Sequence, residues 1–131
     1  MNKVAIAINN KAQSNTDLMN RLDNDFNYFK AGNSATLPYS TFHPVSESPE
    51  KAFQSDNIEN GLWQINIFSN SSTEVGEILE LIKQTFDDAE LNIENHNNLN
   101  CGRENARIVE IENENKFHGI LEYRIYTEGV I

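Results

Sequence analysis

The stretch that most constrains the fold is residues 61–86, because it predicts a strand followed directly by a helix. Within residues 62–68, side-chain character alternates with a period of two, which is typical of a half-buried strand. One face carries Trp63, Ile65 and Ile67, and we expect this face to lie against the core. The other face mixes polar and apolar side chains: Leu62, Gln64, Asn66 and Phe68.

The helix is predicted to follow the polar residues 69–73. Ser71 and Glu74 have the spacing of a capping box, in which each side chain satisfies a backbone N–H of the first helical turn. Apolar residues then recur every three or four positions and form one stripe, widened by Ile78: Val75, Leu79, Ile82 and Phe86. We expect this stripe to pack on the apolar face of the strand.

The remaining segments predict an α+β fold with an antiparallel sheet, a main helix packed on one face and a short N-terminal helix. Alanines in residues 3–12 favour that first helix, and a second short helical turn is expected at residues 18–22. Leu91 and Ile93 are expected to begin a short strand. Longer strands are predicted at residues 37–45, 103–112 and 117–127, the last two forming an antiparallel hairpin. We expect residues 1–131 to form one domain.

The acidic composition limits the possible partners. The chain has a formal net charge of −10 and a pI near 4.6. Such a surface repels nucleic acid at long range, so tight binding along a DNA backbone is not expected. No apolar run approaches the ~18 residues of a membrane span, and residues 1–10 are too short and too soon polar for a secretory signal. The single cysteine, Cys101, excludes an intrachain disulfide and fits a reduced intracellular compartment.

Residues 46–60 join two predicted strands and are polar almost throughout. A connection of this length is long for a hairpin, and long loops often carry function. Phe53 is a lone aromatic residue in the polar run, so we consider Glu50, Lys51 and Phe53 as candidates for contact with another molecule. The alternative is an ordinary solvated loop.

No group of residues predicts catalysis, a metal or a cofactor. His43, His96 and His118 lie in different segments, and no pair has the close helical spacing of a zinc site. Cys101 has no nucleophile motif around it and is interpreted as a small, half-buried thiol. The acidic clusters lack the alternating ligands and central glycine of a calcium loop. The residues alone indicate a non-enzymatic module that works by contact.

Several short motifs follow one another in an order that narrows this interpretation. They are Leu-Pro-Tyr-Ser-Thr-Phe at 37–42, Ser-Pro-Glu at 48–50, Trp-Gln-Ile-Asn-Ile-Phe-Ser at 63–69, Thr-Phe-Asp-Asp-Ala-Glu-Leu at 85–91 and Tyr-Arg-Ile at 123–125. This order resembles the tail-completion, or tail-terminator, proteins of tailed bacteriophages. Residues 23–36 depart from the family pattern, because they lack its glycine-rich entry and basic residue. Glu90 is an insertion that lengthens the exit from the helix by one residue.

The resemblance implies a structural role in the virion at the head–tail junction, after assembly in the host cytoplasm. Proteins of this family form rings, usually hexameric, on the head-proximal end of the tail tube. The ring stops tube growth and offers a docking face to the neck. The implied partners are further copies of the chain, the tail tube protein and a head completion or connector protein. DNA passes through the ring without specific binding, and no membrane is involved.

The same resemblance gives roles to two sets of residues. Residues 46–60 would form an arm on a neighbouring subunit or the tail tube, with Glu50 and Lys51 at the contact and Phe53 as its apolar anchor. Acidic side chains lining the bore would repel passing DNA at close range, because the Debye length is only ~8 Å at physiological salt. The candidates for that lining are Asp87, Asp88, Glu90, Glu110, Glu112 and Glu114. The alternative for each is solubilising charge on the outer surface.

Two other classes of function stay open at this point. A small acidic partner-binding protein, such as an immunity protein that plugs a basic toxin site, fits the charge equally well. An enzyme with a pocket assembled from loops is the third class. Oligomeric state separates a ring-forming protein from an immunity protein, which is normally a monomer or dimer.

Overall fold

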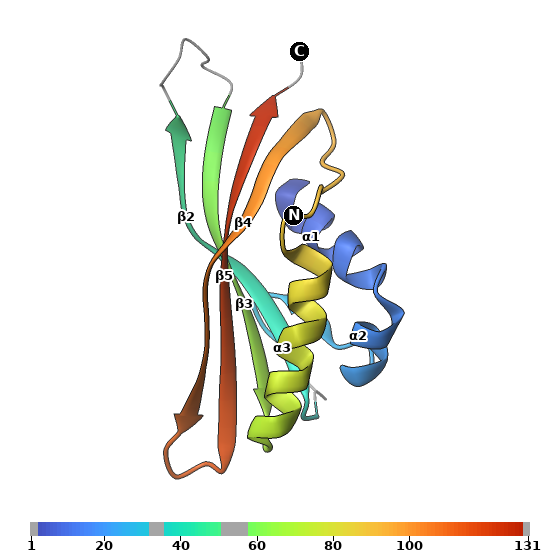
Figure 1. Cartoon of the computed structure of the whole chain (residues 1–131), viewed down its shortest axis with the longest axis vertical. Helices are drawn as coiled ribbons and strands as arrows, with labels where there is room; N and C mark the ends of the chain where they lie inside the picture. Colours follow the sequence, from blue (N-terminus) through green and yellow to red (C-terminus); the bar gives the residue numbers. More distant parts are fainter. Residues whose placement is uncertain (1–2, 32–35, 51–57, 130–131) are drawn as a thin grey trace.

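The computed structural model describes residues 3–31, 36–50 and 58–129 and contains three helices and five strands within them (Figure 1). In chain order these elements are α1 (Lys3–Gln13), α2 (Thr16–Arg21), β1 (Phe26–Tyr28), β2 (Tyr39–Glu50), β3 (Ile58–Ser69), α3 (Ser72–Phe86), β4 (His96–Ile111) and β5 (Lys116–Gly129). No helix in the described part of the chain has the length and apolarity to cross a membrane.

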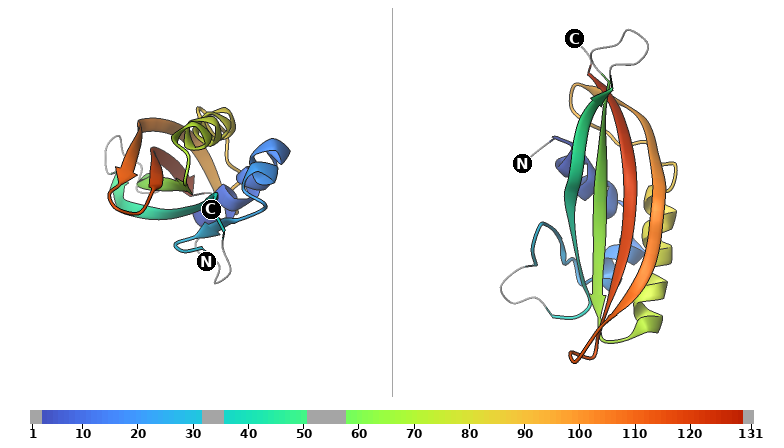
Figure 2. Two further views of the ribbon diagram at one scale, coloured as in Figure 1. Left: turned by 90° about the horizontal axis from the view of Figure 1, so that it is seen from below. Right: turned by 90° about the vertical axis from the view of Figure 1, so that its left-hand side faces the viewer.

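The five strands form one curled sheet in the order β1-β2-β3-β5-β4. β1 pairs with β2 in parallel, and the other three pairs are antiparallel. All three helices lie on one side of this sheet, and the right-hand view of Figure 2 looks onto the strands with the helices behind them. The opposite side of the sheet, named here the helix-free face, carries no helix among the described residues.

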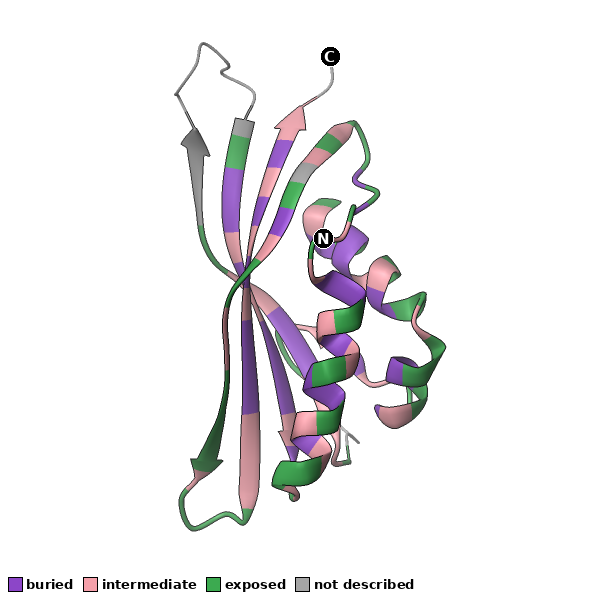
Figure 3. Cartoon of the chain, in the orientation of Figure 1, coloured by how far each residue is buried: buried purple, intermediate pink, exposed green. Residues whose placement is uncertain are grey.

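The core lies between the helices and the sheet, where buried residues gather in Figure 3. As predicted, Trp63, Ile65 and Ile67 of β3 are buried. The apolar stripe of α3 is buried in the same cluster: Val75, Ile78, Leu79, Ile82 and Phe86. Alternation along β3 and a helical period along α3 thus place the two apolar surfaces together.

The N-terminus of α3 is capped by a relay of three side chains. Ser71 Oγ accepts a 3.3 Å hydrogen bond from the backbone N–H of Glu74, as the capping-box spacing predicts. In a capping box the Glu74 carboxylate would accept from the Ser71 backbone N–H. Here it accepts instead from the Ser69 hydroxyl at 2.5 Å. Ser69 Oγ in turn accepts from the Ser71 backbone N–H at 3.1 Å. The relay ties the end of β3 to the first turn of α3.

The mixed helix and strand content and the mostly antiparallel sheet agree with the predicted α+β class, whereas the parallel pairing of β1 with β2 was not predicted and several boundaries were wrong. Residues 46–60 are not one long loop, because β2 continues to Glu50 and β3 begins at Ile58. The strand passes Pro44 by a register shift between Pro44 and Ser46, which lets a proline remain within a paired strand.

The segment after α3 also differs from the prediction. Leu91 and Ile93 do not begin a strand, and Ile93 makes only an isolated bridge to His96. β4 begins at His96, well before the predicted start at residue 103. Pairing with β5 holds this asparagine-rich segment extended, with Asn98 Nδ2 donating to the Tyr126 carbonyl at 3.1 Å. Tertiary pairing therefore overrides the weak strand propensity of asparagine here.

Candidate functional site

The helix-free face is centred on Asn66, a polar residue of β3 that is only 4% exposed. Its amide nitrogen donates to Thr41 Oγ1 and to His43 Nδ1, each at 3.3 Å. Its amide oxygen accepts from His118 Nε2 at 2.8 Å and from Gln64 Nε2 at 2.6 Å. Four side chains from β2, β3 and β5 therefore satisfy one buried amide, and such a complete network favours a single arrangement of the face.

The two histidines of this network differ in their surroundings. The ring of His118 stacks on Phe68 with centroids 4.5 Å apart, and that of His43 stacks on Phe29 at 5.8 Å. Burial, together with the charges of Arg107 and His43, lowers the pKa of His118 below its ordinary value. His118 is therefore a neutral hydrogen-bond donor near pH 7, which suits a positioning role better than proton transfer.

Ion pairs and amides cover the same face between β3, β5 and β4. Arg124 Nε donates to the Glu104 carboxylate at 2.7 Å, and its Nη1 reaches the Asn60 amide oxygen at 2.5 Å. Glu122 accepts from Asn105 Nδ2 at 2.9 Å. These partners lie on neighbouring strands, so the charges tie the strands together rather than converge on a ligand.

Two edges of the sheet are open within the described part of the chain. β5 covers one edge of β4, and no described strand covers the other. β1 pairs with β2 only opposite Ser40 to Phe42, which leaves the remaining outer edge of β2 without a described strand. Unpaired edges are templates for adding a strand from another chain.

The predicted acidic residues fall into two separate places. Asp88 and Glu90 are exposed just after α3, where the Asp88 N–H donates to the Cys101 carbonyl at 3.0 Å. Asp87 is held within the subunit by Tyr123 Oη at 2.7 Å and Arg103 Nε at 3.1 Å. The second set, Glu110, Glu112 and Glu114, is exposed at the β4–β5 turn. Glu110 lies nine residues beyond Cys101 along β4, a separation of about 30 Å for an extended strand.

The predicted contact residues can be placed only in part. Glu50 ends β2, whereas Lys51 and Phe53 lie outside the described residues.

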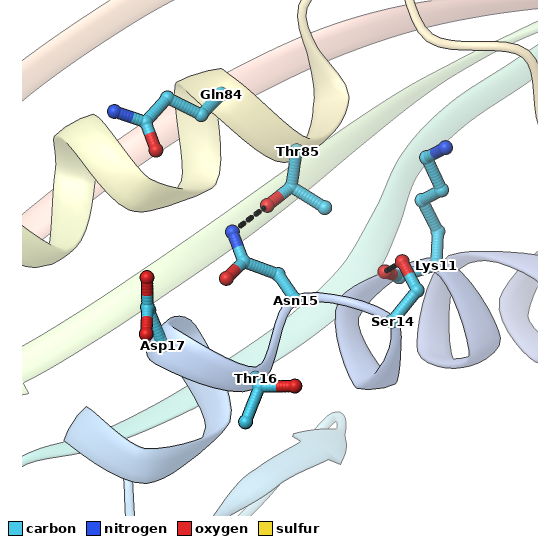
Figure 4. A pocket seen from close by; sticks show the side chains of 7 residues that line it. All are labelled: Lys11, Ser14, Asn15, Thr16, Asp17, Gln84 and Thr85. Carbon is cyan, nitrogen blue, oxygen red and sulfur yellow. Dashed lines mark hydrogen bonds between the residues drawn. The ribbon is translucent and has the colours of Figure 1, made fainter.

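A polar hollow of about 340 Å³ lies between the α1–α2 turn and the end of α3 (Figure 4). Asn15 lies beside it and is fully engaged, since its Oδ1 caps α2 by accepting from Leu18 N–H and its Nδ2 donates to Thr85 Oγ1 at 2.8 Å. The lining contains neither histidine nor cysteine: Lys11, Ser14, Asn15, Thr16, Asp17, Gln84 and Thr85. Nothing in the hollow forms a nucleophile–base pair, so its hydrogen bonds serve to join the helices.

Cys101 and the histidines form no catalytic or metal centre in the described residues. Burial, and next the charges of Asp87 and Asp88, raise the pKa of the Cys101 thiol to about 12, so it is inert. No group of three metal-ligating side chains occurs in the described ranges. The meeting of His43 and His118 at Asn66 was not predicted from the sequence. The polar alternation of Gln64 and Asn66 on β3 was its one available signal.

Comparisons with known proteins agree with the motif order. A family model for tail completion protein gp17 matches residues 9–128. A solved chain from the virion of a native gene transfer agent (GTA) particle is similar at a TM-score of 0.83 and 11% identity, covering 95% of this chain and 93% of that chain. A second solved structure has a TM-score of 0.63 and 9% identity and covers 98% of this chain and 94% of that chain. No curated protein sequence matches.

These likenesses carry different weight. The two structures share little sequence with this chain, so they show a common fold only. The family model spans nearly the whole chain, including β2, β3, α3 and β5, which carry the motifs. The chain therefore belongs to the tail completion protein gp17 family, whose members are structural proteins of phage tails and thus components of the virion.

Proposed function

We propose that residues 1–131 form one domain that assembles into a hexameric ring on the head-proximal end of the tail tube. The ring stops tube growth and joins the tail to the neck, without enzymatic activity. The observation that carries this proposal is the long, mostly antiparallel sheet, which has an open edge on each side among the described residues, in a chain of the tail completion family. The similar chain comes from the virion of a gene transfer agent particle, which supports a place for this chain in a virion.

A closed ring needs head-to-tail contacts in which two different surfaces of each subunit meet. The two open edges satisfy this requirement because the uncovered part of β2 and the outer edge of β4 lie at opposite edges of the sheet. A chain with one open edge would instead favour a two-fold dimer. The proposed partners are further copies of the chain, the tail tube protein and a head completion or connector protein.

The segment around Glu50, Lys51 and Phe53 remains our candidate for contact with a neighbouring subunit or the tail tube. Glu50 stands at the end of β2 that carries the open edge, which supports a place near a subunit boundary. We expect Phe53→Ala to leave the melting temperature unchanged and to weaken ring formation. An unchanged ring would remove Phe53 from the interface.

The bore of the ring is proposed to be acidic. Six subunits of formal charge −10 carry a total of −60 before counterions. Asp88 and Glu90 after α3 form one candidate lining, and Glu110, Glu112 and Glu114 form the other. The two sets lie far apart along β4, so they would line different levels of the bore. Asp87 is already paired with Arg103 and adds less repulsion.

Polymerisation of the tail tube protein tests the function directly. Purified tube protein grows tubes whose lengths are measured by electron microscopy, with and without this chain. We expect the chain to stop elongation and to appear as a ring at one tube end, with heads joining only the capped tails. Unchanged tube lengths, together with a chain that never appears on tubes, would refute the proposal.

The acidic bore is tested separately, on assembled particles. Charge reversal of Asp88 and Glu90, or of the three hairpin glutamates, should slow DNA ejection for the set that lines the bore. A ring structure with both sets on the outside, around a bore of Lys and Arg, would refute this part alone.

A further inference from the structure

Phe29 has a strained backbone and an exposed side chain. Its φ angle is 67°, and the Lys30 N–H donates to the Tyr28 carbonyl at 2.9 Å, which is the pattern of a γ-turn. Every other described non-glycine residue with positive φ is Asn or Asp, which tolerate this region. The Phe29 side chain is nevertheless 56% exposed. A bulky residue held in strain without burial indicates a surface used for contact.

The strained turn lies where the outer edge of β2 becomes open. The Phe29 N–H donates to the Phe42 carbonyl at 2.8 Å, and its ring stacks on His43. From His43 to Glu50, β2 has no described strand on its outer side. Val45 lies on this stretch at the register shift and is 49% exposed. The open edge therefore begins with two exposed apolar side chains, Phe29 and Val45.

The opposite edge of the sheet also carries exposed apolar side chains. Ile108 and Val109 of β4 are each 42% exposed, and successive strand residues point to opposite faces. The ladder between β4 and β5 is regular from Asn105 to Ile111, after the register shift between Arg103 and Asn105. This part of the edge contains no lysine, proline or bulge, and its exposed charged residues are Arg107 and Glu110.

The pairing registers place the exposed apolar residues of the two edges at a similar level along the strands. Phe42 pairs with Ile65, Ile65 with Leu121, and Leu121 with Ala106. Phe29, bonded to Phe42, is therefore level with Ala106, two residues from Ile108. A rotation about an axis along the strands preserves this level, so it brings the Phe29 end of one copy to the exposed part of β4 in another.

The strand directions agree with the same arrangement. β2, β3, β5 and β4 alternate in direction, so β2 and β4 of one copy are antiparallel. After rotation about an axis along the strands, β2 of one copy lies antiparallel to β4 of the next. Contact between two β4 edges would instead need a two-fold axis across the strands.

The charges of the two edges are complementary. Residues 45–50 carry two glutamates and no basic residue, whereas β4 carries Arg103 and Arg107. Within the subunit, Arg103 is paired with Asp87 at 3.1 Å, and Arg107 lies 4.0 Å from Glu122. Two β4 edges would place arginines against each other, and two β2 edges would do the same with glutamates.

We infer that the open edge of β2, flanked by Phe29 and Val45, pairs with the outer edge of β4 in a second copy of the chain. The sheet then continues antiparallel from one copy to the next, with Val45 at the level of Gly102 and Arg103 of β4 and Phe29 at the level of Ala106. This inference rests on the proposed ring and names its subunit contact.

Disulfide cross-linking tests the pairing. Val45→Cys is combined with Gly102→Cys or with Arg103→Cys in the full chain, and covalent species are counted on non-reducing gels after mild oxidation. Positions on β2 and β4 of one copy are three strand spacings apart, about 14 Å, which exceeds the ~7 Å limit for a disulfide. Native Cys101 is buried and contributes no background. Val45→Cys with Thr73→Cys, at the exposed start of α3, is the matched control.

We expect a ladder of linked species up to the size of the ring from at least one β2–β4 pair, and none from the control. A dimer formed by one single-cysteine variant alone would show like edges meeting and would overturn the inference. Rings seen by electron microscopy without any β2–β4 cross-link would leave the ring intact and overturn the edge pairing. Absence of both rings and cross-links, with tail tubes present, would overturn both proposals.

Removal of Phe29 provides an independent measurement. Phe29→Gly relieves the strained φ, so the melting temperature should stay equal or rise, while ring formation weakens about tenfold or more, as for an interface hot spot. Phe29→Asn serves as a second variant because Asn tolerates positive φ. Ile6→Ala, at an exposed apolar residue of α1, is the control and should leave assembly unchanged. Unaltered assembly by both Phe29 variants would count against the contact.

Discussion

Tyr123 Oη donates a 2.7 Å hydrogen bond to Oδ1 of Asp87, which joins the middle of β5 to the residue that ends α3. Tyr123 is 1% exposed, and burial together with this bond raises the pKa of the phenol, so it stays a donor. Arg103 Nε shares the same carboxylate oxygen at 3.1 Å. An acid first considered as lining for a channel is thus part of the joint between helix and sheet.

Removal of the Tyr123 hydroxyl should weaken that joint. We expect Tyr123→Phe to lower the free energy of unfolding by about 1–2 kcal/mol, because a hydrogen bond to a charged but partly solvated group is lost. Urea unfolding measures the loss. Tyr126→Phe removes a hydroxyl from the opposite face of β5 and should change stability less. Equal effects of the two variants would show that the Asp87 bond contributes nothing specific.

The apolar stripe of α3 should carry much of the stability. Ile82 is fully buried and Leu79 nearly so, in one cluster with Trp63 and Ile65. Truncating either α3 residue to Ala should cost ~2–5 kcal/mol through lost transfer energy and the cavity left behind. Glu80→Ala, exposed on the same helix, controls for helix propensity. An unchanged melting temperature for Leu79→Ala would contradict the packing of α3 on the sheet.

Gly119 allows α3 to approach β5 closely. A Cβ atom at this position would lie 2.6 Å from Val75 Cγ1, and Val75 is fully buried. Gly119→Ala should therefore destabilise by about 1–3 kcal/mol through overpacking. Val75→Ala removes the clashing methyl, so the double variant should be more stable than the sum of the single losses predicts. Strict additivity in this cycle would rule out the steric explanation.

Cys101 should resist thiol reagents until the chain unfolds. Its pKa is raised to about 12 by burial, with a smaller contribution from Asp87 and Asp88. A raised pKa stabilises the fold below the ordinary value near 9, and this contribution is lost as the pH rises from 9 through 12. Labelling by Ellman's reagent at pH 8 should follow the unfolding rate. Fast labelling of the native protein would contradict the burial of the thiol.

Stability should fall as His118 becomes protonated. Burial, Arg107 and His43 lower its pKa below the ordinary 6.5, so the contribution of neutral His118 is present above pH 6.5 and is lost as the pH falls through the folded pKa. Melting temperatures from pH 7.5 to 5 should decline less in His118→Gln, whose amide can still donate to Asn66. His96→Gln is the control, because it replaces a different histidine and leaves every carboxylate in place. Parallel curves for all three proteins would refute the role of His118.

The amino-acid sequence by itself determined the local elements with strong periodicity. The alternation of Trp63, Ile65 and Ile67 identified the buried face of β3, and the three-and-four spacing with a Ser71 cap identified α3. Alanine content identified α1, and the order of the motifs indicated the tail-completion family. These features follow from interactions within one strand or one helical turn, which neighbours in sequence specify.

Only the tertiary structure decided how far the strands extend and which side chains meet. β2 passes Pro44 and β4 includes the asparagines from His96 onward because strands distant in sequence supply their hydrogen bonds. His43 and His118 converge on Asn66, and Asp87 turns to Tyr123, through cross-strand and helix–sheet packing. The γ-turn at Phe29 likewise depends on the Phe42 carbonyl of β2. Register and packing are non-local, so no periodicity within a single segment encodes them.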